Sequence, residues 1–349
     1  MNTIRIGIIG AGRMGLTHLA ILNTDPRVEI ASVADTSRTV LEVLGRHVRC
    51  RTFRDYDRLL ADDPPDALVV CTPPTLHYDI LRAALEHRMH VFCEKPFTVS
   101  AARAHELADG FEAADLVNQV GYVNRFNDVF AHVRKLLDED VLGRIQRYRT
   151  DIVSATLTRP QNGSGDGWRS SHATGGGVTY EMGSHAIDLV NFLLRKKPDS
   201  VTGTVMNRVY SRDVEDVVST TLLHEDGCAG TMLADWCNRT VRKPANRIEI
   251  AGEKGRISAD QYSVRIWLEK GDPERGLEEG WNTRYITDVF QPVPYYVRGN
   301  EFTRQLRHFT ANVSGERANG HCTFRMGAET HDVIESMFED GNSNGGMRR

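Results

Sequence analysis

The chain has 349 residues, which is long for one domain and sufficient for two. Hydrophobic residues make up 40% of the sequence and charged residues 26%, the usual proportions of a water-soluble globular protein. The formal net charge of -4 gives no sign of a nucleic-acid-binding surface or of a polybasic membrane anchor, so we expect neither kind of partner.

Cysteine usage and hydropathy predict a cytoplasmic location. The cysteines are Cys50, Cys71, Cys93, Cys228, Cys237 and Cys322. They form no C-x-x-C pair, which predicts reduced thiols and no metal site. The first apolar run, at residues 4–9, is too short for a signal peptide, and no run approaches the ~20 residues that cross a bilayer.

Short apolar runs alternate with helical patterns through the first third of the chain. Strands are predicted over residues 4–9, 28–34, 67–71, 90–93 and 116–121, and helices over 12–22, 78–86 and after Ser100. This alternation is typical of a parallel sheet with right-handed crossovers. Residues 1–123 are therefore predicted to form a doubly wound parallel sheet of the Rossmann type.

The pattern changes near residues 121–125. A helix at 128–137 and a strand at 145–153 are predicted before a Gly/Ser/Asn-rich loop at 161–167, which is followed by a helix at 180–194. Strands are then predicted at 200–205, 217–223, 228–234, 247–251 and 263–267, and helices at 301–312 and 327–338. Successive strands predict a mostly antiparallel sheet, so the whole chain is α/β and residues 124–340 form an α+β domain with an open sheet. Residues 341–349 are predicted to be a flexible tail.

A glycine-rich turn joins the first predicted strand to the first helix. Its pattern is Gly10-x-Gly12-x-x-Gly15, and Asp35 ends the next strand 25 residues after Gly10. Glycines allow a tight turn and a close approach of backbone to a pyrophosphate, whose charge is attracted by the helix N-terminus. The turn therefore predicts a dinucleotide site, with a glycine-rich turn that binds nothing as the alternative.

Two side chains of the second strand end bear on the choice of cofactor. Asp35 is placed to accept hydrogen bonds from both ribose hydroxyls and repels a 2′-phosphate, which favours NAD. Arg38 lies in the same turn and is able to pair with a 2′-phosphate, so NADP stays open. The alternative for Arg38 is a solvated charge at the start of a helix.

Two further strand ends are expected at the edge where ligands of such sheets bind. Thr72-Pro73 follows the strand at 67–71, and Cys93-Glu94-Lys95-Pro96 ends the strand at 90–93. Proline stiffens both turns and directs Lys95 toward the crevice. The alternatives are a rigid connection for the first turn and a surface ion pair for the second.

One helix face in the second domain carries the parts of a general base. Gly175-Gly176-Gly177 precedes the helix, and Glu181, His185 and Asp188 follow at spacings of four and three residues. A histidine between two carboxylates is suited to proton transfer. The alternative is a polar helix face on which the two acids satisfy the histidine.

These motifs, in this order, resemble the glucose-fructose oxidoreductase/inositol dehydrogenase/rhizopine catabolism (Gfo/Idh/MocA) family. The most specific part is the pairing of Glu94-Lys95-Pro96 with the helix that carries His185. The resemblance implies an NAD(P)-binding Rossmann domain followed by a domain whose open sheet serves oligomerisation. We therefore expect a homodimer or homotetramer.

The resemblance also implies roles by position. Lys95 and His185 match catalytic residues of the family. Glu181 stands where the family usually has an aspartate, so its carboxylate has the same charge on a side chain that is one methylene longer. The residues expected to bind the cofactor are Gly10, Gly12, Arg13, Met14, Gly15, Asp35, Arg38, Thr72, Pro73, His77, Glu94 and Lys95. Those expected to bind the substrate are Lys95, Arg125, Trp168, Glu181 and His185.

The predicted reaction is hydride transfer between a nicotinamide and a secondary alcohol of a sugar or cyclitol. His185 accepts the hydroxyl proton and Lys95 stabilises the alkoxide oxygen. A cationic segment at 239–243, with Arg247, suits a phosphate or nucleotide on the sugar, or is a basic surface turn. An NAD(P)-sensing regulator without turnover and a dehydrogenase of a non-carbohydrate diol are the alternative functions.

Overall fold

The computed structural model divides the chain into two compact units, which are described separately. Unit 1 comprises Met1–Phe126 and Pro292–Ala328, and unit 2 comprises Asn127–Gln291 and Glu329–Arg349. The structure describes residues 3–159, 167–316, 320–343 and 345–347. Most of the predicted loop at 161–167 therefore lies outside the described residues.

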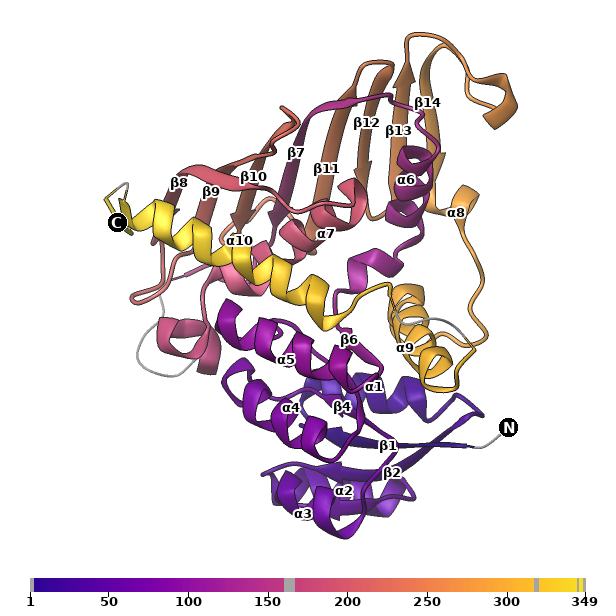
Figure 1. Cartoon of the computed structure of the whole chain (residues 1–349), viewed down its shortest axis with the longest axis vertical. Coiled ribbons are helices and arrows are strands. Elements are labelled where there is room, and N and C mark those ends of the chain that lie inside the picture. Colours follow the sequence, from indigo (N-terminus) through magenta and orange to yellow (C-terminus); the bar gives the residue numbers. More distant parts are fainter. Residues whose placement is uncertain (1–2, 160–166, 317–319, 344, 348–349) are drawn as a thin grey trace. The chain divides into compact units, whose positions relative to one another are not determined.

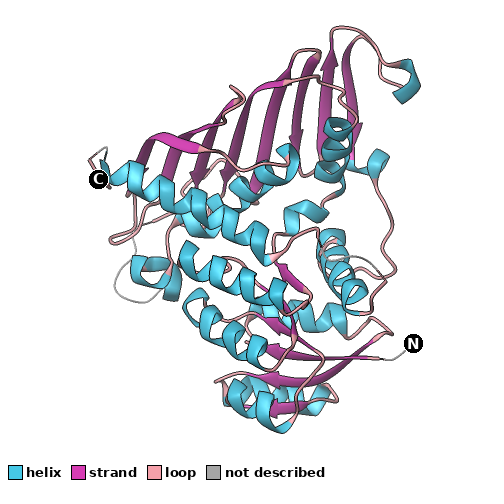
Figure 2. Cartoon of the chain, in the orientation of Figure 1, coloured by secondary structure: helices cyan, strands magenta, loops and turns pink. Residues whose placement is uncertain are grey.

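Unit 1 contains a six-stranded parallel sheet with helices between successive strands (Figures 1 and 2). The strand order is β3-β2-β1-β4-β5-β6, which confirms the predicted doubly wound sheet. The strands are β1 (Ile4–Ile9), β2 (Val28–Ala34), β3 (Arg51–Phe53), β4 (Ala67–Val70), β5 (His90–Cys93) and β6 (Asn118–Val120). The helices are α1 (Arg13–Leu22), α2 (Arg38–His47), α3 (Tyr56–Asp62), α4 (His77–Glu86), α5 (Ala101–Ala113) and α9 (Asn300–Val313).

The central strands of this sheet are largely apolar because helices cover both of their faces. All four residues of β4 are fully buried, as expected for a strand inside a parallel sheet. The strand order reverses between β1 and β4, and ligands of doubly wound sheets bind at the carboxyl ends of the strands at such a point. Strand β3 and the helices α2 and α3 were not predicted. Strand β3 has only three residues, two of them exposed.

Unit 2 contains an eight-stranded sheet of order β14-β13-β12-β11-β7-β10-β9-β8 (Figure 1). Every neighbouring pair is antiparallel except β7 and β10, so the prediction of a mostly antiparallel sheet is confirmed. The strands are β7 (Ile145–Val153), β8 (Ser200–Asn207), β9 (Val217–Leu223), β10 (Ala229–Asp235), β11 (Ala245–Gly252), β12 (Gly255–Asp260), β13 (Ser263–Leu268) and β14 (Gly280–Tyr285). Strands β12 and β14 were not predicted from the sequence, and both begin with glycine and contain charged residues.

One face of this sheet is apolar and lies under helices. The helices of unit 2 are α6 (Asp128–Asp138), α7 (Ser184–Leu194), α8 (Ile286–Val289) and the part of α10 (Phe324–Ser343) that follows Ala328. Along β9, buried Val218, Thr220 and Leu222 alternate with more exposed residues, the period of a strand with one covered face.

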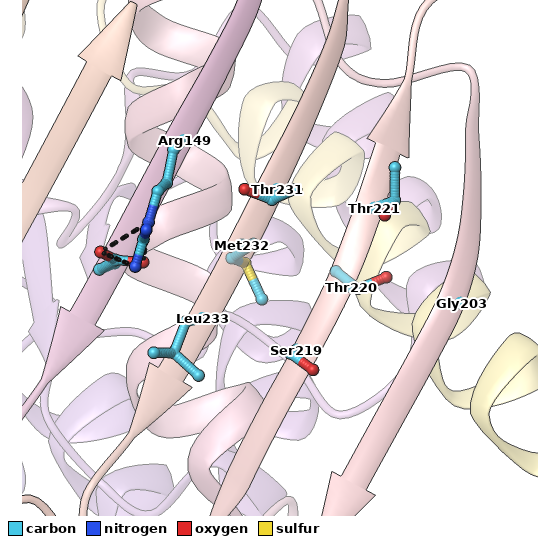
Figure 3. Close-up of a pocket in the computed structure, with 9 residues that line it drawn as sticks. Arg149, Gly203, Ser219, Thr220, Thr221, Thr231, Met232 and Leu233 are labelled. Atoms are coloured by element: carbon cyan, nitrogen blue, oxygen red, sulfur yellow. Dashed lines mark hydrogen bonds and ion pairs between the residues drawn. The ribbon is translucent and has the colours of Figure 1, made fainter.

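The opposite face of the sheet is polar and open. Figure 3 shows a shallow hollow on it, lined by residues of β7, β8, β9 and β10 that include Ser219, Thr231 and Leu233. Arg149 and Asp151 form an ion pair of 3.0 Å between guanidinium and carboxylate there. Toward the β14 edge, Trp267 and Trp281 are 39% and 49% exposed and lie directly opposite each other on β13 and β14.

The compact units differ from the predicted domains in where the chain returns. Residues 124–340 are predicted as one domain, whereas Pro292–Ala328, with α9, packs with unit 1. Phe309 of α9 is fully buried against Phe92 of β5, with 6.0 Å between the ring centroids. Helix α10 also continues to Ser343, so it includes the first residues of the segment predicted as a tail.

Within the described residues, no helix is both long enough and apolar enough to cross a membrane. The same residues contain no group of three or more His, Cys, Asp or Glu side chains that could hold a metal ion.

Candidate active site

Two of the three glycines in the first turn are required sterically. Gly10 has φ +92°, and a Cβ at this position would lie 2.8 Å from the carbonyl carbon of Cys71. A Cβ at Gly15 would overlap the Gly10 carbonyl oxygen, so this glycine allows α1 to pack against the turn. A Cβ at Gly12 would meet nothing within 4 Å, so this position faces open space.

The N-terminus of α1 fits a dinucleotide pyrophosphate. Gly12 caps the helix without a side-chain hydrogen bond, and no acidic residue lies in the first turn. The first N–H groups of the helix are therefore open to an anion and carry the positive end of the helix dipole. Thr72 Oγ1, at the neighbouring strand end, is buried without a hydrogen-bond partner among the described residues.

Asp35 lies against the glycine turn. Its Oδ2 accepts a hydrogen bond of 2.6 Å from the Ala11 N–H, and its Oδ1 accepts one of 2.7 Å from the Ser37 N–H. The carboxylate is thus held at the end of β2 beside the predicted cofactor site. Arg38 is 80% exposed and pairs with Glu42 at 2.9 Å, which favours the solvated alternative for this residue.

His77 joins the two turns at the ends of β4 and β5. Its ring nitrogens lie 2.8 Å from the Thr72 carbonyl oxygen and 3.0 Å from the Pro96 carbonyl oxygen. The side chain is buried, and this burial lowers the pKa of His77. Both ring nitrogens contact backbone, which favours a role in holding these turns over the predicted direct contact with the cofactor.

The turn after β5 holds a buried carboxylate. Glu94 Oε1 lies 2.6 Å from His18 Nε2, and Glu94 Oε2 accepts a hydrogen bond of 3.2 Å from the Lys95 N–H. Burial raises the pKa of Glu94, but the hydrogen bond from His18 and the nearby positive charge more than offset it and hold that pKa below its usual range. Glu94 is 9% exposed, so the alternative of a surface ion pair does not describe this turn. The Lys95–Pro96 peptide bond is cis.

The second group of predicted residues lies on η5 (Thr179–Gly183) and α7 in unit 2. The segment η5 is a single π-helical turn, whereas the prediction was a regular helix from residue 180. It carries Glu181, and the first turn of α7 carries His185. Turns of this kind are frequent at functional sites. Asp188, in the following turn, is fully buried.

Trp168 and Arg169 lie beside this helical segment. The Arg169 guanidinium is 3.1 Å from the Glu181 carboxylate and stacks over the Trp168 ring at 4.6 Å. Arg169 therefore restricts the Glu181 carboxylate. The contact also places the predicted substrate residues Trp168 and Glu181 within one small cluster.

A buried acid that sequence reasoning missed supports the start of this segment. Glu215 is fully buried, and its Oε1 accepts a hydrogen bond of 2.9 Å from the Thr179 N–H. Burial raises the pKa of Glu215. Gly177 has φ +102°, and a Cβ there would overlap the Glu215 carboxylate, which explains one glycine of the triple run. The sequence signal is weak because Glu215 lies 34 residues beyond Glu181.

The cationic segment at 239–243 lies in the loop between β10 and β11. Arg239 donates to the carbonyl oxygen of Thr158, and Arg242 and Lys243 are exposed. The Asn238 N–H donates to the Ser154 carbonyl oxygen at 2.9 Å, and Ser154 Oγ lies 3.3 Å from Met182 Sδ in η5. The loop is therefore connected to the segment that carries Glu181.

Arg125 has a different environment from the one predicted. It is 4% exposed, and its Nη1 donates to the His321 carbonyl oxygen at 2.8 Å. The same nitrogen lies 3.0 Å from Met326 Sδ. This guanidinium anchors the chain before α10 inside unit 1, which favours a structural role over the predicted substrate contact.

The structure thus brings the predicted residues together in two sets. Unit 1 gathers the glycine turn, with Arg13 and Met14 in the first turn of α1, and places Asp35, Thr72 and Lys95 at the carboxyl edge of one sheet. Unit 2 gathers Trp168, Glu181 and His185 around η5 and α7. The joint action of Lys95 and His185 stays a prediction because they belong to different units.

A doubly wound parallel sheet, with a glycine turn whose helix has no side-chain cap, is typical of dinucleotide-binding proteins, and comparison with known families gives the particular class. Residues 4–122 match the model of the oxidoreductase family with an NAD-binding Rossmann fold, and residues 130–258 match the GFO/IDH/MocA C-terminal domain. The two models together match more than half of the chain. The chain belongs to the Gfo/Idh/MocA family of oxidoreductases.

Individual relatives extend over most of the chain. Inositol 2-dehydrogenase of Rhizobium meliloti is 28% identical over 304 residues, which cover 86% of this chain and 89% of the relative. Myo-inositol 2-dehydrogenase of Thermotoga maritima is 26% identical over 90% of this chain and 89% of the relative.

Solved structures agree with this chain in fold. An oxidoreductase domain protein of Kribbella flavida has a TM-score of 0.86 at 23% identity, with 99% of this chain and 98% of that chain covered. Levoglucosan dehydrogenase with NADH and levoglucosan has a TM-score of 0.82 at 20% identity, with 98% of each chain covered.

Proposed function

We propose that this protein catalyses reversible hydride transfer between NAD and a secondary alcohol of a sugar or cyclitol. The observation that carries the proposal is the turn Glu94-Lys95-Pro96, whose buried acid holds the lysine backbone at the sheet edge that also carries the open glycine turn. The names of the inositol dehydrogenases and of levoglucosan dehydrogenase support a polyol substrate.

The residues of the chain divide the chemistry between them. When bound, NAD supplies a nicotinamide ring that takes up the hydride from the carbinol carbon. An imidazole nitrogen of His185 accepts the hydroxyl proton, while Lys95 Nζ donates a hydrogen bond to the same oxygen as its charge develops. His185 then releases the proton to solvent. Ketone reduction uses the same groups in the opposite direction.

Glu181 has an orienting role in this scheme. Its side chain is one methylene longer than the aspartate that the resemblance implies, so the carboxylate lies farther from the backbone. Arg169 Nε lies 3.1 Å from Glu181 Oε1. A carboxylate that is restricted in this way is suited to a substrate hydroxyl or to the base, since small errors in placement are costly at a reacting centre.

The expected cofactor preference is NAD over NADP. The Asp35 carboxylate, held beside the glycine turn at 2.6 Å from the Ala11 N–H, repels a 2′-phosphate. Arg38 points its charge toward Glu42 and solvent, which leaves the acid dominant. We also place the enzyme in the cytoplasm, a location supported by its six free cysteines.

A substrate panel tests the proposal. Sugars, inositols and their phosphates are offered with NAD and with NADP, and formation of the reduced nicotinamide is followed by absorbance. We expect turnover with at least one polyol and a kcat/KM for NAD about tenfold or more above that for NADP, the magnitude of one charge-assisted contact. Better rates with phosphorylated members would assign a role to the cations at 239–243.

A matched pair of variants checks the cofactor assignment. Asp35→Ser is expected to reduce the preference for NAD by about tenfold or more, because the repulsive charge is lost. Asp79→Ser removes an exposed acid from the first turn of α4 and should leave the preference unchanged.

Tight NAD binding without turnover on any substrate would instead indicate a regulator, and turnover restricted to apolar diols would indicate a non-carbohydrate dehydrogenase.

We further propose that the open face of the sheet in unit 2 pairs with a second copy of the chain. It exposes Trp267 and Trp281 beside ion pairs such as Arg149–Asp151, a mixed surface suited to a symmetric interface. Sedimentation velocity is expected to show a dimer or tetramer, and a monomer at micromolar concentration would contradict this part of the proposal.

A further inference from the structure

His18 is a polar residue with an apolar surrounding. It lies in the second turn of α1 and is fully buried. Its ring contacts Phe92 edge-on, with 5.2 Å between centroids, and lies 6.5 Å from the Phe302 centroid. Nδ1 has no hydrogen-bond partner among the described residues, so the polar contact of the ring is the one from Nε2 to Glu94 at 2.6 Å.

The Glu94 carboxylate is held on both of its oxygens. Oε1 receives the His18 contact and Oε2 accepts from the Lys95 N–H at 3.2 Å. Because the pKa of Glu94 is below its usual range, the group is an anion near neutral pH, and His18 Nε2 is the donor. A Cβ at Gly121 would lie 3.1 Å from the carboxyl carbon, so there is little free space beside the acid.

We propose that His18 is a positioning residue that fixes the Glu94 carboxylate and, through it, the backbone of Lys95. The catalytic role of Lys95 in this statement rests on the proposed function, whereas the contacts among the three residues do not. His18 and the glycine turn belong to the same helix, so the contact ties the cofactor-binding element to the turn that carries the lysine.

The physical reason is the cost of leaving a buried anion without its donor. Without the His18 N–H, the Glu94 carboxylate keeps its desolvation but loses its shortest hydrogen bond. It must then become protonated or move, and either change weakens the contact to the Lys95 N–H. If His18 only filled space in the core, an apolar side chain of similar size could replace it without any effect on Glu94 or on the Lys95 N–H.

Hydrogen exchange of the Lys95 amide directly measures how well the Lys95 N–H is held by Glu94 Oε2. The exchange rate of this N–H is measured by NMR in the whole protein, relative to the Val69 amide in buried β4, for wild type, His18→Leu and His18→Gln. We expect at least about tenfold faster relative exchange in His18→Leu, and a rate within about threefold of wild type in His18→Gln, whose amide N–H can replace the donor. Should His18→Leu fail to fold, His18→Asn, whose amide is too short to reach Glu94, takes its place.

His90→Leu is the matched control. His90 is another partly buried histidine of unit 1, at the opposite end of β5, and its Nδ1 accepts from the Val117 N–H at 3.0 Å. This variant loses a hydrogen bond but should leave relative exchange at Lys95 within about threefold of wild type. Equal exchange of the Lys95 amide in His18→Leu and wild type, or an equal increase in His90→Leu, would overturn the proposal.

Kinetics separate this proposal from the proposed function. On a polyol substrate, His18→Leu is expected to lower kcat about tenfold or more while the Kd for NAD changes less than about threefold, because the lysine is displaced and the phosphate turn is not. If no polyol is turned over by wild type, the proposed function fails, and the exchange rates still decide whether His18 positions Lys95. An unchanged kcat in His18→Leu with active wild type counts against the positioning role.

Discussion

Lys95→Met is expected to lower kcat for polyol oxidation by about 10²–10³, the cost of removing one donor to a developing oxyanion. Methionine keeps most of the length and apolar volume of the lysine stem but carries neither charge nor donor. The buried Glu94 contact involves the Lys95 backbone N–H and not its side chain, so the turn itself should be retained. The Kd for NAD, measured by quenching of intrinsic fluorescence, is therefore expected to change little.

A second lysine controls for the loss of charge. Lys135 is 71% exposed on α6 and pairs only at 3.8 Å with Glu139, so Lys135→Met should have the same kcat as wild type. A rate for Lys95→Met within threefold of wild type would remove this residue from the mechanism. An equal loss of NAD binding and of turnover would show that the lysine serves the cofactor and not the oxyanion.

His185→Ala is expected to lower kcat by about 10²–10⁴, the usual contribution of a positioned general base. The residue lies in the first turn of α7, directly after the π-helical turn that carries Glu181. Because the missing group is a proton acceptor, added imidazole should restore part of the rate, and the restoration should grow with the unprotonated fraction of imidazole. Steady-state rates across a series of imidazole concentrations provide the measurement.

His132→Ala is the comparison for this variant. His132 is half-buried on α6 of the same unit, and its burial lowers its pKa, yet it lies outside the cluster around Glu181. Its replacement should change stability more than rate, with no response to imidazole. Wild-type kcat in His185→Ala, or equal rescue of both variants, would show that another group accepts the proton.

Local patterns in the sequence were sufficient for the main architecture and for the cofactor turn. The glycine spacing, the acid at Asp35 and the strand–helix alternation each depend on residues close in the chain, and the structure places them as expected. The antiparallel sheet followed from the succession of strands without helices. Elements that carry few apolar residues, such as β3 and β14, gave no such pattern and were missed.

Partners that are distant in the chain could not be inferred in this way. His18 meets Glu94 across 76 residues, and Glu215 meets Thr179 across 36. Buried Arg125 donates a hydrogen bond to a carbonyl oxygen 196 residues away, and its predicted substrate contact stays a prediction. The residues next to these side chains in the sequence do not predict the contact partner, because each contact forms only when the strands pair and the helices pack.

The residue types and their short-range order were enough to indicate that a dinucleotide binds at Gly10–Gly15 and that Lys95 stands at the edge of the same sheet. Folding of the whole chain decided how that lysine is held, by a buried carboxylate whose charge is stabilised by a histidine on the cofactor helix. It also decided that Pro292–Ala328 return to the first unit. The physical reason is the same for both: burial and hydrogen bonding depend on which surfaces meet, and hydrophobic periodicity reports only that a surface will be covered.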